Sequence, residues 1–339
     1  MVVAAAEARG WLFATLFVTI GGIAAAAMLA PAEAAPAGRT LSWLLFVGSS
    51  VHVAASGWLL AVPEVRAHAQ QHRARYLWVP LGLSAGGALA AGAIAPQSLE
   101  WLLLAFFAWQ FLHFQKQNLG LVALAASSHG AGSLQPDERA ALLIAGHAGT
   151  LAIVARPRLL GLGIDPGLDV LFTAAAIVFS GAALAGSRAL LARSRNERPS
   201  PLVAMYFTAF VFWLPVFVFR SPFAAVGGLV IAHGLQYLLL TGLVAAGGRA
   251  AGDRVTALAR AAFVVLAGAA VLSAASHLHA SGRPTRWLYG AYVGVVASHF
   301  VVDAGLWRLR DAFPRQFLAS RLPYLVPGSR SAADIECQT

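Results

Sequence analysis

Four histidines lie well inside long apolar stretches of the sequence, at His52, His113, His233 and His299. Ionisable side chains at membrane depth are costly unless they pair, line a cavity or hold a ligand. Neutral imidazole nitrogens suit iron, zinc, copper or manganese, and a nitrogen and oxygen ligand set with open positions is typical of iron sites that activate dioxygen. These residues therefore predict a metal centre, with non-haem iron as the first choice.

Polar side chains one helical turn after these histidines support the prediction. Asp303 follows His299 by four residues, so its carboxylate could orient the imidazole or ligate the metal itself. Tyr237 and Gln117 each follow another of the four histidines by four residues. We expect these two to act as catalytic groups that hydrogen-bond an oxygen-derived ligand.

The alternative for each histidine is a structural one, because a single histidine in a membrane helix is usually a hydrogen-bond partner between helices. The four histidines, however, each fall roughly 15–20 Å along their helix at a rise of 1.5 Å per residue. Scattered structural histidines have no reason to share a depth. A common depth favours one shared site near the middle of the bilayer.

The composition places these residues in a membrane protein. The chain has 339 residues, of which 59% are hydrophobic and only 11% are charged, against about 25% charged residues in soluble domains. Cys337 is the only cysteine, so a disulfide framework and a thiolate metal site are excluded. The net charge of +10 comes from basic loops rather than a basic domain, and we predict no nucleic-acid partner.

The hydropathy pattern predicts an all-α integral membrane protein with about ten transmembrane helices. Each segment approaches the roughly 20 apolar residues that a membrane helix needs. The first could instead be a signal peptide, but its apolar run is long for one, and we expect a retained helix. The segments are 11–31, 41–62, 77–96, 99–125, 139–160, 168–191, 202–219, 223–246, 256–276 and 286–307.

The distribution of basic residues predicts the orientation. With a cytoplasmic N-terminus, most loop arginines fall on the cytoplasmic side, as the positive-inside rule requires. Both termini are then cytoplasmic, residues 1–310 form one transmembrane domain and 311–339 form a cytoplasmic tail. The expected location is a membrane of the bacterial inner or plasma type, with membrane lipids as partners. The basic cytoplasmic face could also dock an acidic electron-transfer partner.

Other polar residues have simpler explanations. Lys116 is expected to reach toward the cytoplasmic interface, with pairing to Asp303 as the alternative. His147 lies among small residues and is interpreted as a packing residue or a weaker candidate ligand. His68 and His72 form an HxxxH pair, but the arginines around them oppose metal binding and favour a basic helix at the lipid surface.

The sequence resembles the membrane-embedded, histidine-rich non-haem iron oxygenases in a few short patches. These are Ser298-His299-Phe300 followed by Asp303, Trp109 followed by His113, and the segments of His52 and His233. The most similar group is the bacterial carotenoid-cleaving (Brp/Blh-like) dioxygenases. The resemblance implies iron and a lipid-soluble substrate.

Three functions therefore remain open, besides a partner or assembly protein without chemistry. The first is a membrane-bound, metal-dependent oxidoreductase that acts on a lipid-soluble substrate. The second is a haem-binding membrane protein, because paired histidines on separate helices hold haem in integral cytochromes. The third is a transporter with a polar site at the midplane. Motifs of nucleotide motors, dinucleotide folds, serine hydrolases and zinc proteases do not occur.

Overall fold

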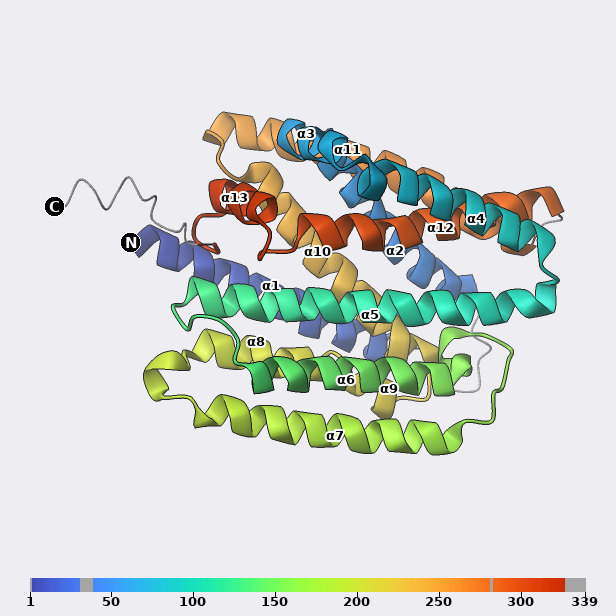
Figure 1. Cartoon of the computed structure of the whole chain (residues 1–339), viewed down its shortest axis with the longest axis horizontal. Coiled ribbons are helices and arrows are strands. Elements are labelled where there is room, and N and C mark those ends of the chain that lie inside the picture. Colours follow the sequence, from blue (N-terminus) through green and yellow to red (C-terminus); the bar gives the residue numbers. More distant parts are fainter. Residues whose placement is uncertain (1, 31–38, 281–282, 327–339) are drawn as a thin grey trace.

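The computed structural model describes residues 2–30, 39–280 and 283–326, and these residues form helices and connecting loops without a β-strand. The long helices run side by side along one axis (Figure 1). They are α1 (Val2–Met28), α2 (Arg39–Ala61), α4 (Val79–Ala93), α5 (Pro96–Ser128), α6 (Pro136–Ala155), α7 (Asp169–Ala192), α8 (Ser200–Val211), α10 (Gly228–Ala246), α11 (Ala251–Ser276) and α12 (Arg283–Leu306).

The shorter elements mark turns and interruptions. Pro215 lacks a backbone N–H, and the predicted segment 202–219 accordingly breaks between α8 and α9 (Leu214–Val218). Two π-helical turns, η1 and η4, lead into α4 and α10. The remaining elements are α3 (Pro63–Gln71), η1 (Ala74–Trp78), η2 (Pro157–Leu160), η3 (Arg195–Glu197), η4 (Phe223–Gly227), η5 (His277–Ala280) and α13 (Ala312–Arg321).

Eight helical segments within the described residues are long and apolar enough to cross a membrane. This confirms the prediction of an all-helical chain and indicates a multi-pass membrane protein. The helices α2 and α5 are not among the eight, although each matches a predicted segment. The count of ten and the cytoplasmic location of the termini stay predictions. The first helix begins at Val2, before the predicted start, and part of the first predicted loop lies outside the described residues.

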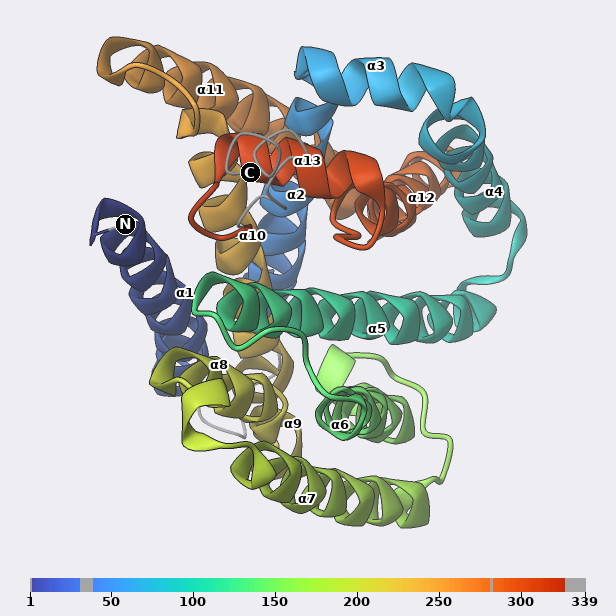
Figure 2. The ribbon, with the colours of Figure 1, turned by 60° about the vertical axis from the view of Figure 1, so that its left-hand side comes forward.

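Large apolar side chains point away from the bundle on its outer helices. Phe17 on α1 is 78% exposed, Val170 on α7 86% and Phe263 on α11 73%. Such faces would be unfavourable in water and are compatible with contact to lipid. The helix α5 lies in the middle of the bundle, with helices on both sides (Figure 2), and many of its side chains belong to the main buried core.

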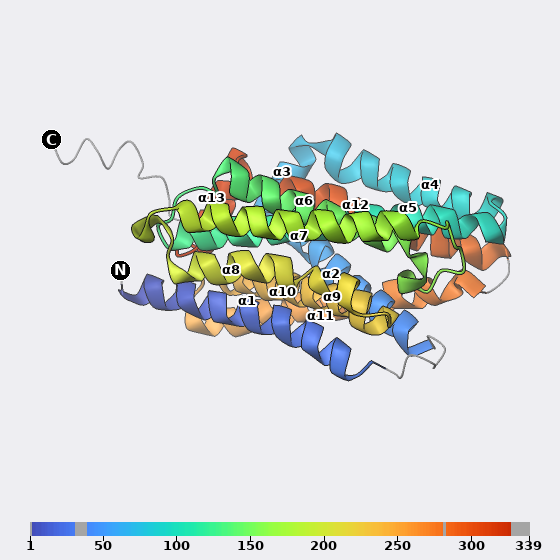
Figure 3. The same cartoon turned by 90° about the horizontal axis from the view of Figure 1, so that it is seen from below.

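The helices α2, α5, α10 and α12 begin at the same end of the bundle and run toward the opposite end, with α2 and α10 inclined to α5, as Figure 1 shows. Figure 3 shows the same bundle from below. The helix α1 begins at the opposite end, where α13 also lies. Of the predicted tail, the described residues 311–326 pack against the bundle. Leu318, Leu322 and Leu325 are buried in the main core, and Arg321 forms an ion pair of 2.6 Å with Glu64 on α3.

A buried ion pair holds the α6–α7 hairpin at the end where α13 lies. Glu138 is fully buried and receives two hydrogen bonds from Arg193, of 2.5 and 2.6 Å. Arg193 also donates to the carbonyls of Ala131 and Ser133, and the Glu138 side chain caps the start of α6. Each polar atom of the pair thus has a partner, which offsets the cost of burying the two charges.

Replacing Arg193 by Met should lower the free energy of unfolding by about 3–5 kcal/mol, because Glu138 would remain buried without a counter-charge. The matched control is Arg158→Met, since the pair Arg158–Asp165 is exposed and such pairs contribute only about 0–1 kcal/mol. Unfolding of both variants in detergent measures the difference. Equal stability of the two variants would show that the buried pair has no structural role.

Candidate metal centre

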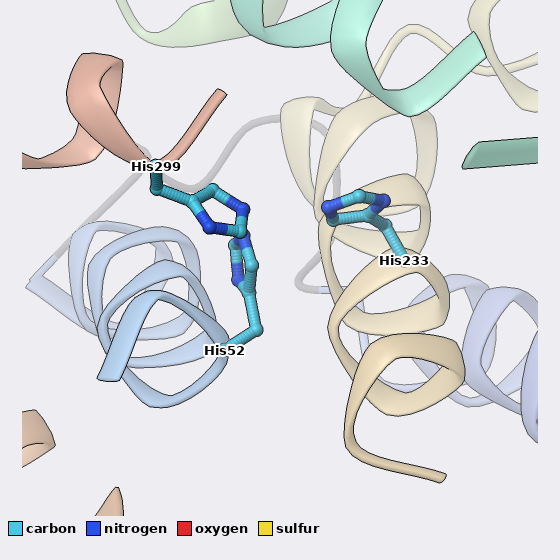
Figure 4. Close-up of side chains that lie close together, drawn as sticks. All are labelled: His52, His233 and His299. Carbon is cyan, nitrogen blue, oxygen red and sulfur yellow. The ribbon is translucent and has the colours of Figure 1, made fainter. Parts of the chain in front are cut away.

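The four predicted histidines meet at one place inside the bundle. His52 on α2 lies edge-on to His233 on α10 and to His299 on α12, with ring centroids 4.8 Å apart in both pairs. His113 on α5 closes the set, because its ring lies 5.2 Å from His233 and 4.9 Å from His299. Figure 4 shows three of these rings, which point toward one another from three helices. The common depth inferred from the sequence thus corresponds to contact between the rings.

Several of the histidine nitrogens lack protein partners. Within the described residues, Nε2 of His113, Nε2 of His299 and both ring nitrogens of His233 are buried and make no hydrogen bond. A neutral imidazole always carries one N–H and one lone pair, so His233 leaves both a donor and an acceptor unsatisfied. Buried polar groups are normally paired, and each exception requires an explanation. A bound ligand at the centre of the four rings would provide one.

The spacing of the ligand atoms suits a metal ion. There are two sets of three possible ligand atoms, and within each set the atoms lie within 4.8 Å of one another. One set comes from His52, His233 and His299, and the other from His113, His299 and Asp303. Two nitrogens bound to one ion at about 2.1 Å lie at most about 4.2 Å apart. Small rotations of the rings would therefore complete a ligand set.

A hydrogen-bond network fixes His299 and Asp303. The hydroxyl of Ser56 lies 2.7 Å from Nδ1 of His299 and donates to Oδ1 of Asp303 at 3.2 Å. Tyr237 donates to the same carboxylate oxygen at 2.9 Å, and its hydroxyl is 2.5 Å from that of Ser56. The indole N–H of Trp307 donates to Tyr237 at 3.4 Å. Because Nδ1 of His299 is engaged, Nε2 is the nitrogen that remains for a metal.

Asp303 is the charged member of the site. Its side chain is only 4% exposed, and its oxygens lie 3.5 Å from Nδ1 of His299 and 3.9 Å from Nε2 of His113. Oδ1 receives the hydrogen bonds of the network, whereas Oδ2 faces His113. A buried carboxylate without a positive partner costs several kcal/mol, so a cation beside Oδ2 would stabilise this arrangement.

His52, His113, His233 and His299 form what we call the histidine layer, and its two sides differ. On all four helices the residue four positions after the histidine is polar, and three of these residues form the network of Ser56, Tyr237 and Asp303. One turn before the histidines lies a small cavity of about 10 Å³, which is room for about one water-sized molecule. It is lined by Ser49, Phe106, Phe107, Gln110, Phe111, Val226, Val230, Tyr292 and Val296, and we call it the apolar chamber.

Gln117 lies beside the site but is engaged with the protein. Its amide donates to the carbonyl of His233 at 3.1 Å and to Gln236 at 2.8 Å. Gln236 continues the chain by donating to Thr19 on α1 at 2.8 Å. These bonds link α5, α10 and α1, so the structure gives Gln117 a positioning contact, and a direct role in chemistry stays a prediction.

The other polar residues of α5 separate into two groups. Gln110 donates to Ser49 at 3.3 Å and lies on the site face. Gln115 lies on another face, where it donates to the carbonyl of Leu142 and accepts from the indole of Trp213, both at 2.7 Å. Lys116 is exposed, as expected for a side chain that reaches toward an interface.

The remaining histidines lie apart from the layer. His68 and His72 have ring centroids 4.2 Å apart, and the ring of Phe313 stacks on His68 at 3.9 Å. Burial and the neighbouring charges of His72 and Arg75 lower the pKa of His68. No third His, Cys, Asp or Glu of the described chain joins this pair in a cluster. His147 is exposed on α6.

Sequence reasoning did not assign a role to Ser56 or Trp307. Both could have been found by spacing, because Ser56 is one turn after His52 and Trp307 is two turns after His299. Their function depends, however, on contacts between α2, α10 and α12 that no spacing along one helix specifies.

Comparisons of the chain with models of known protein families, with curated proteins and with solved structures find no match. The function of the protein must therefore be inferred from the geometry of its site.

Replacing Ser56 by Ala should weaken metal binding by about 10–100-fold, because His299 would lose the contact that fixes its ring and its tautomer. The matched control is Ser49→Ala, which removes a hydroxyl from the same helix on the chamber side of His52. Titration of the metal-free protein with iron(II) or cobalt(II) measures both affinities. An unchanged affinity in Ser56→Ala would contradict the orienting role.

Proposed function

We propose that the protein is a membrane-embedded, metal-dependent oxidoreductase that acts on a lipid-soluble substrate, with non-haem iron as the metal. The observation that carries the proposal is the convergence of buried, unpartnered histidine nitrogens beside Asp303. Inside an apolar bundle such a cluster is unfavourable unless a ligand binds there. Iron is the first choice because of the nitrogen and oxygen donor set and the resemblance to membrane-embedded iron oxygenases.

The residues that would hold the metal are His52, His113, His233 and His299, with Asp303 as a fifth ligand or an orienting group. When bound, iron would supply the activation of dioxygen. The chain itself provides the orientation of His299 through Ser56.

Tyr237 is the group best placed to hold a proton near the site, because its hydroxyl donates to Asp303 and also lies beside Ser56. We therefore retain it as a catalytic candidate. Gln117 is retained as a group that positions α10 through the His233 carbonyl.

The apolar chamber supports an oxygen-dependent reaction. Six of the nine side chains that line it are phenylalanine or valine, and it has room for about one water-sized molecule. An apolar lining favours a small apolar molecule over an ion. A lipid-soluble substrate would reach the site from the bilayer, as the lipid-compatible outer faces of the helices allow.

The ring packing favours non-haem iron over haem as the cofactor. Each histidine ring packs edge-on against two of the others, with ring centroids 4.8–5.2 Å apart. A porphyrin between two axial histidines would have to displace the other two rings. A transporter remains the second candidate, because polar groups at the midplane also mark transport pathways. We further propose a bacterial inner-membrane location and an acidic electron donor at the basic cytoplasmic face.

Metal analysis with an absorption spectrum tests the proposal. We expect the detergent-purified protein to contain one or two equivalents of iron without a Soret band, and His113→Ala and His233→Ala to lose the metal. The control His129→Ala removes a histidine at the end of α5, outside the layer, and should keep it. A Soret band would indicate haem. The proposed site would be rejected if the native protein contains no metal, or if His113→Ala and His233→Ala both retain it.

Filling the apolar chamber should slow the access of small molecules to the metal. In iron-loaded protein, Val296→Phe should slow the binding of nitric oxide by at least about tenfold, a change of about 1.4 kcal/mol in the barrier, with Val296→Leu intermediate. The control is Val271→Phe on α11, where the side chain is 70% exposed. Equal iron content is verified first, and equal binding rates in all variants would exclude the chamber as the route.

A further inference from the structure

A groove on the outer surface of the bundle lies between α6 and α7, away from the histidine layer. Its volume is about 350 Å³, within the range of small-molecule sites, which is roughly 300–1,000 Å³. Small side chains on both helices leave this space open. The lining residues are Leu143, Ile144, His147, Ala148, Leu151, Ala174, Ala175 and Val178.

His147 is the one polar side chain among the described residues that line this groove. Its Nδ1 lies 2.6 Å from the carbonyl oxygen of Leu143, one turn earlier. A carbonyl can only accept a hydrogen bond, so Nδ1 carries the proton. In a neutral imidazole the other nitrogen, Nε2, is then an acceptor with a free lone pair. The groove therefore presents one hydrogen-bond acceptor in an apolar surround.

The position of His147 along α6 makes this acceptor unusual. His147 is the twelfth residue of a helix of 20 residues that is apolar and long enough to span a membrane. At 1.5 Å per residue it lies roughly 16 Å from the start of the helix, near the middle of a bilayer of about 30 Å. Lipid headgroups do not reach this depth. A polar atom that faces lipid here is unfavourable without a partner.

We propose that this groove binds a lipid-soluble molecule with a single hydroxyl group, which donates to Nε2 of His147. Such a molecule combines a hydrogen-bond donor with an otherwise apolar body, which matches one acceptor among alanine, leucine, isoleucine and valine side chains. An acyl chain of an ordinary phospholipid would fill the groove but leave the acceptor unsatisfied. The site is independent of the metal centre, because it uses no residue of the histidine layer.

Photolabelling of the full-length protein in lipid nanodiscs tests this proposal. The two probes are a photoreactive isoprenoid phenol with one hydroxyl group and its methyl ether, which has the same body but no hydroxyl donor. We expect the phenol to label peptides of α6 and α7 about three to ten times more efficiently than the ether, the range that one hydrogen bond provides.

The variant His147→Phe keeps a ring of similar bulk but removes the acceptor, so the preference for the phenol over its ether should disappear. His147→Gln keeps an acceptor oxygen and should retain part of this preference. Iron content, measured in the same samples, should be equal in all three proteins, which separates this site from the metal centre. Equal labelling by both probes in the native protein, or a preference that persists in His147→Phe, would overturn the proposal.

Discussion

The cost of burying four imidazoles and a carboxylate in an apolar bundle is the constraint on which the structure depends. The chain satisfies only part of this polar cluster from its own residues. Ser56 and Tyr237 hydrogen-bond Asp303, and Ser56 also holds His299. Buried nitrogens of His113, His233 and His299 make no hydrogen bond within the described chain. Such an arrangement lowers stability unless a ligand is bound, and this supports the proposal of a metal centre.

The rest of the bundle is arranged so that these side chains can meet. Four helices that begin at the same end of the bundle bring their histidines together. A separate chain of hydrogen bonds, from Gln117 through Gln236 to Thr19, links α5, α10 and α1. On the far side of α5, Gln115 connects to Trp213 and to α6. Hydrogen bonds between helices thus have two roles here. Some connect helices of the scaffold, and others orient the side chains of the candidate site. Unlike apolar packing, a hydrogen bond fixes the direction of the groups that it joins.

The asymmetry across the histidine layer separates two roles. The polar side, with Ser56, Tyr237 and Asp303, fixes ring orientation and can hold a proton. The apolar chamber on the other side is lined mostly by phenylalanine and valine and has room for about one water-sized molecule. This division supports the proposed redox chemistry over transport of ions, which would need a continuous polar path. The groove at His147 would add a second surface for molecules dissolved in the bilayer, as proposed above.

The sequence by itself determined the helices, because an apolar run of about 20 residues has few alternatives in a membrane. Each predicted segment overlaps a helical stretch, although the first helix begins at Val2 rather than at residue 11 and the segment 202–219 is divided into α8 and α9. The spacing also determined that Asp303 and Tyr237 share a face with their histidines. Only the tertiary structure decided which helices are neighbours, and hence that Ser56 contacts His299, that Gln117 holds a backbone carbonyl and that α13 packs on α3. These contacts depend on the rotation and packing of separate helices, which helical periodicity leaves undetermined.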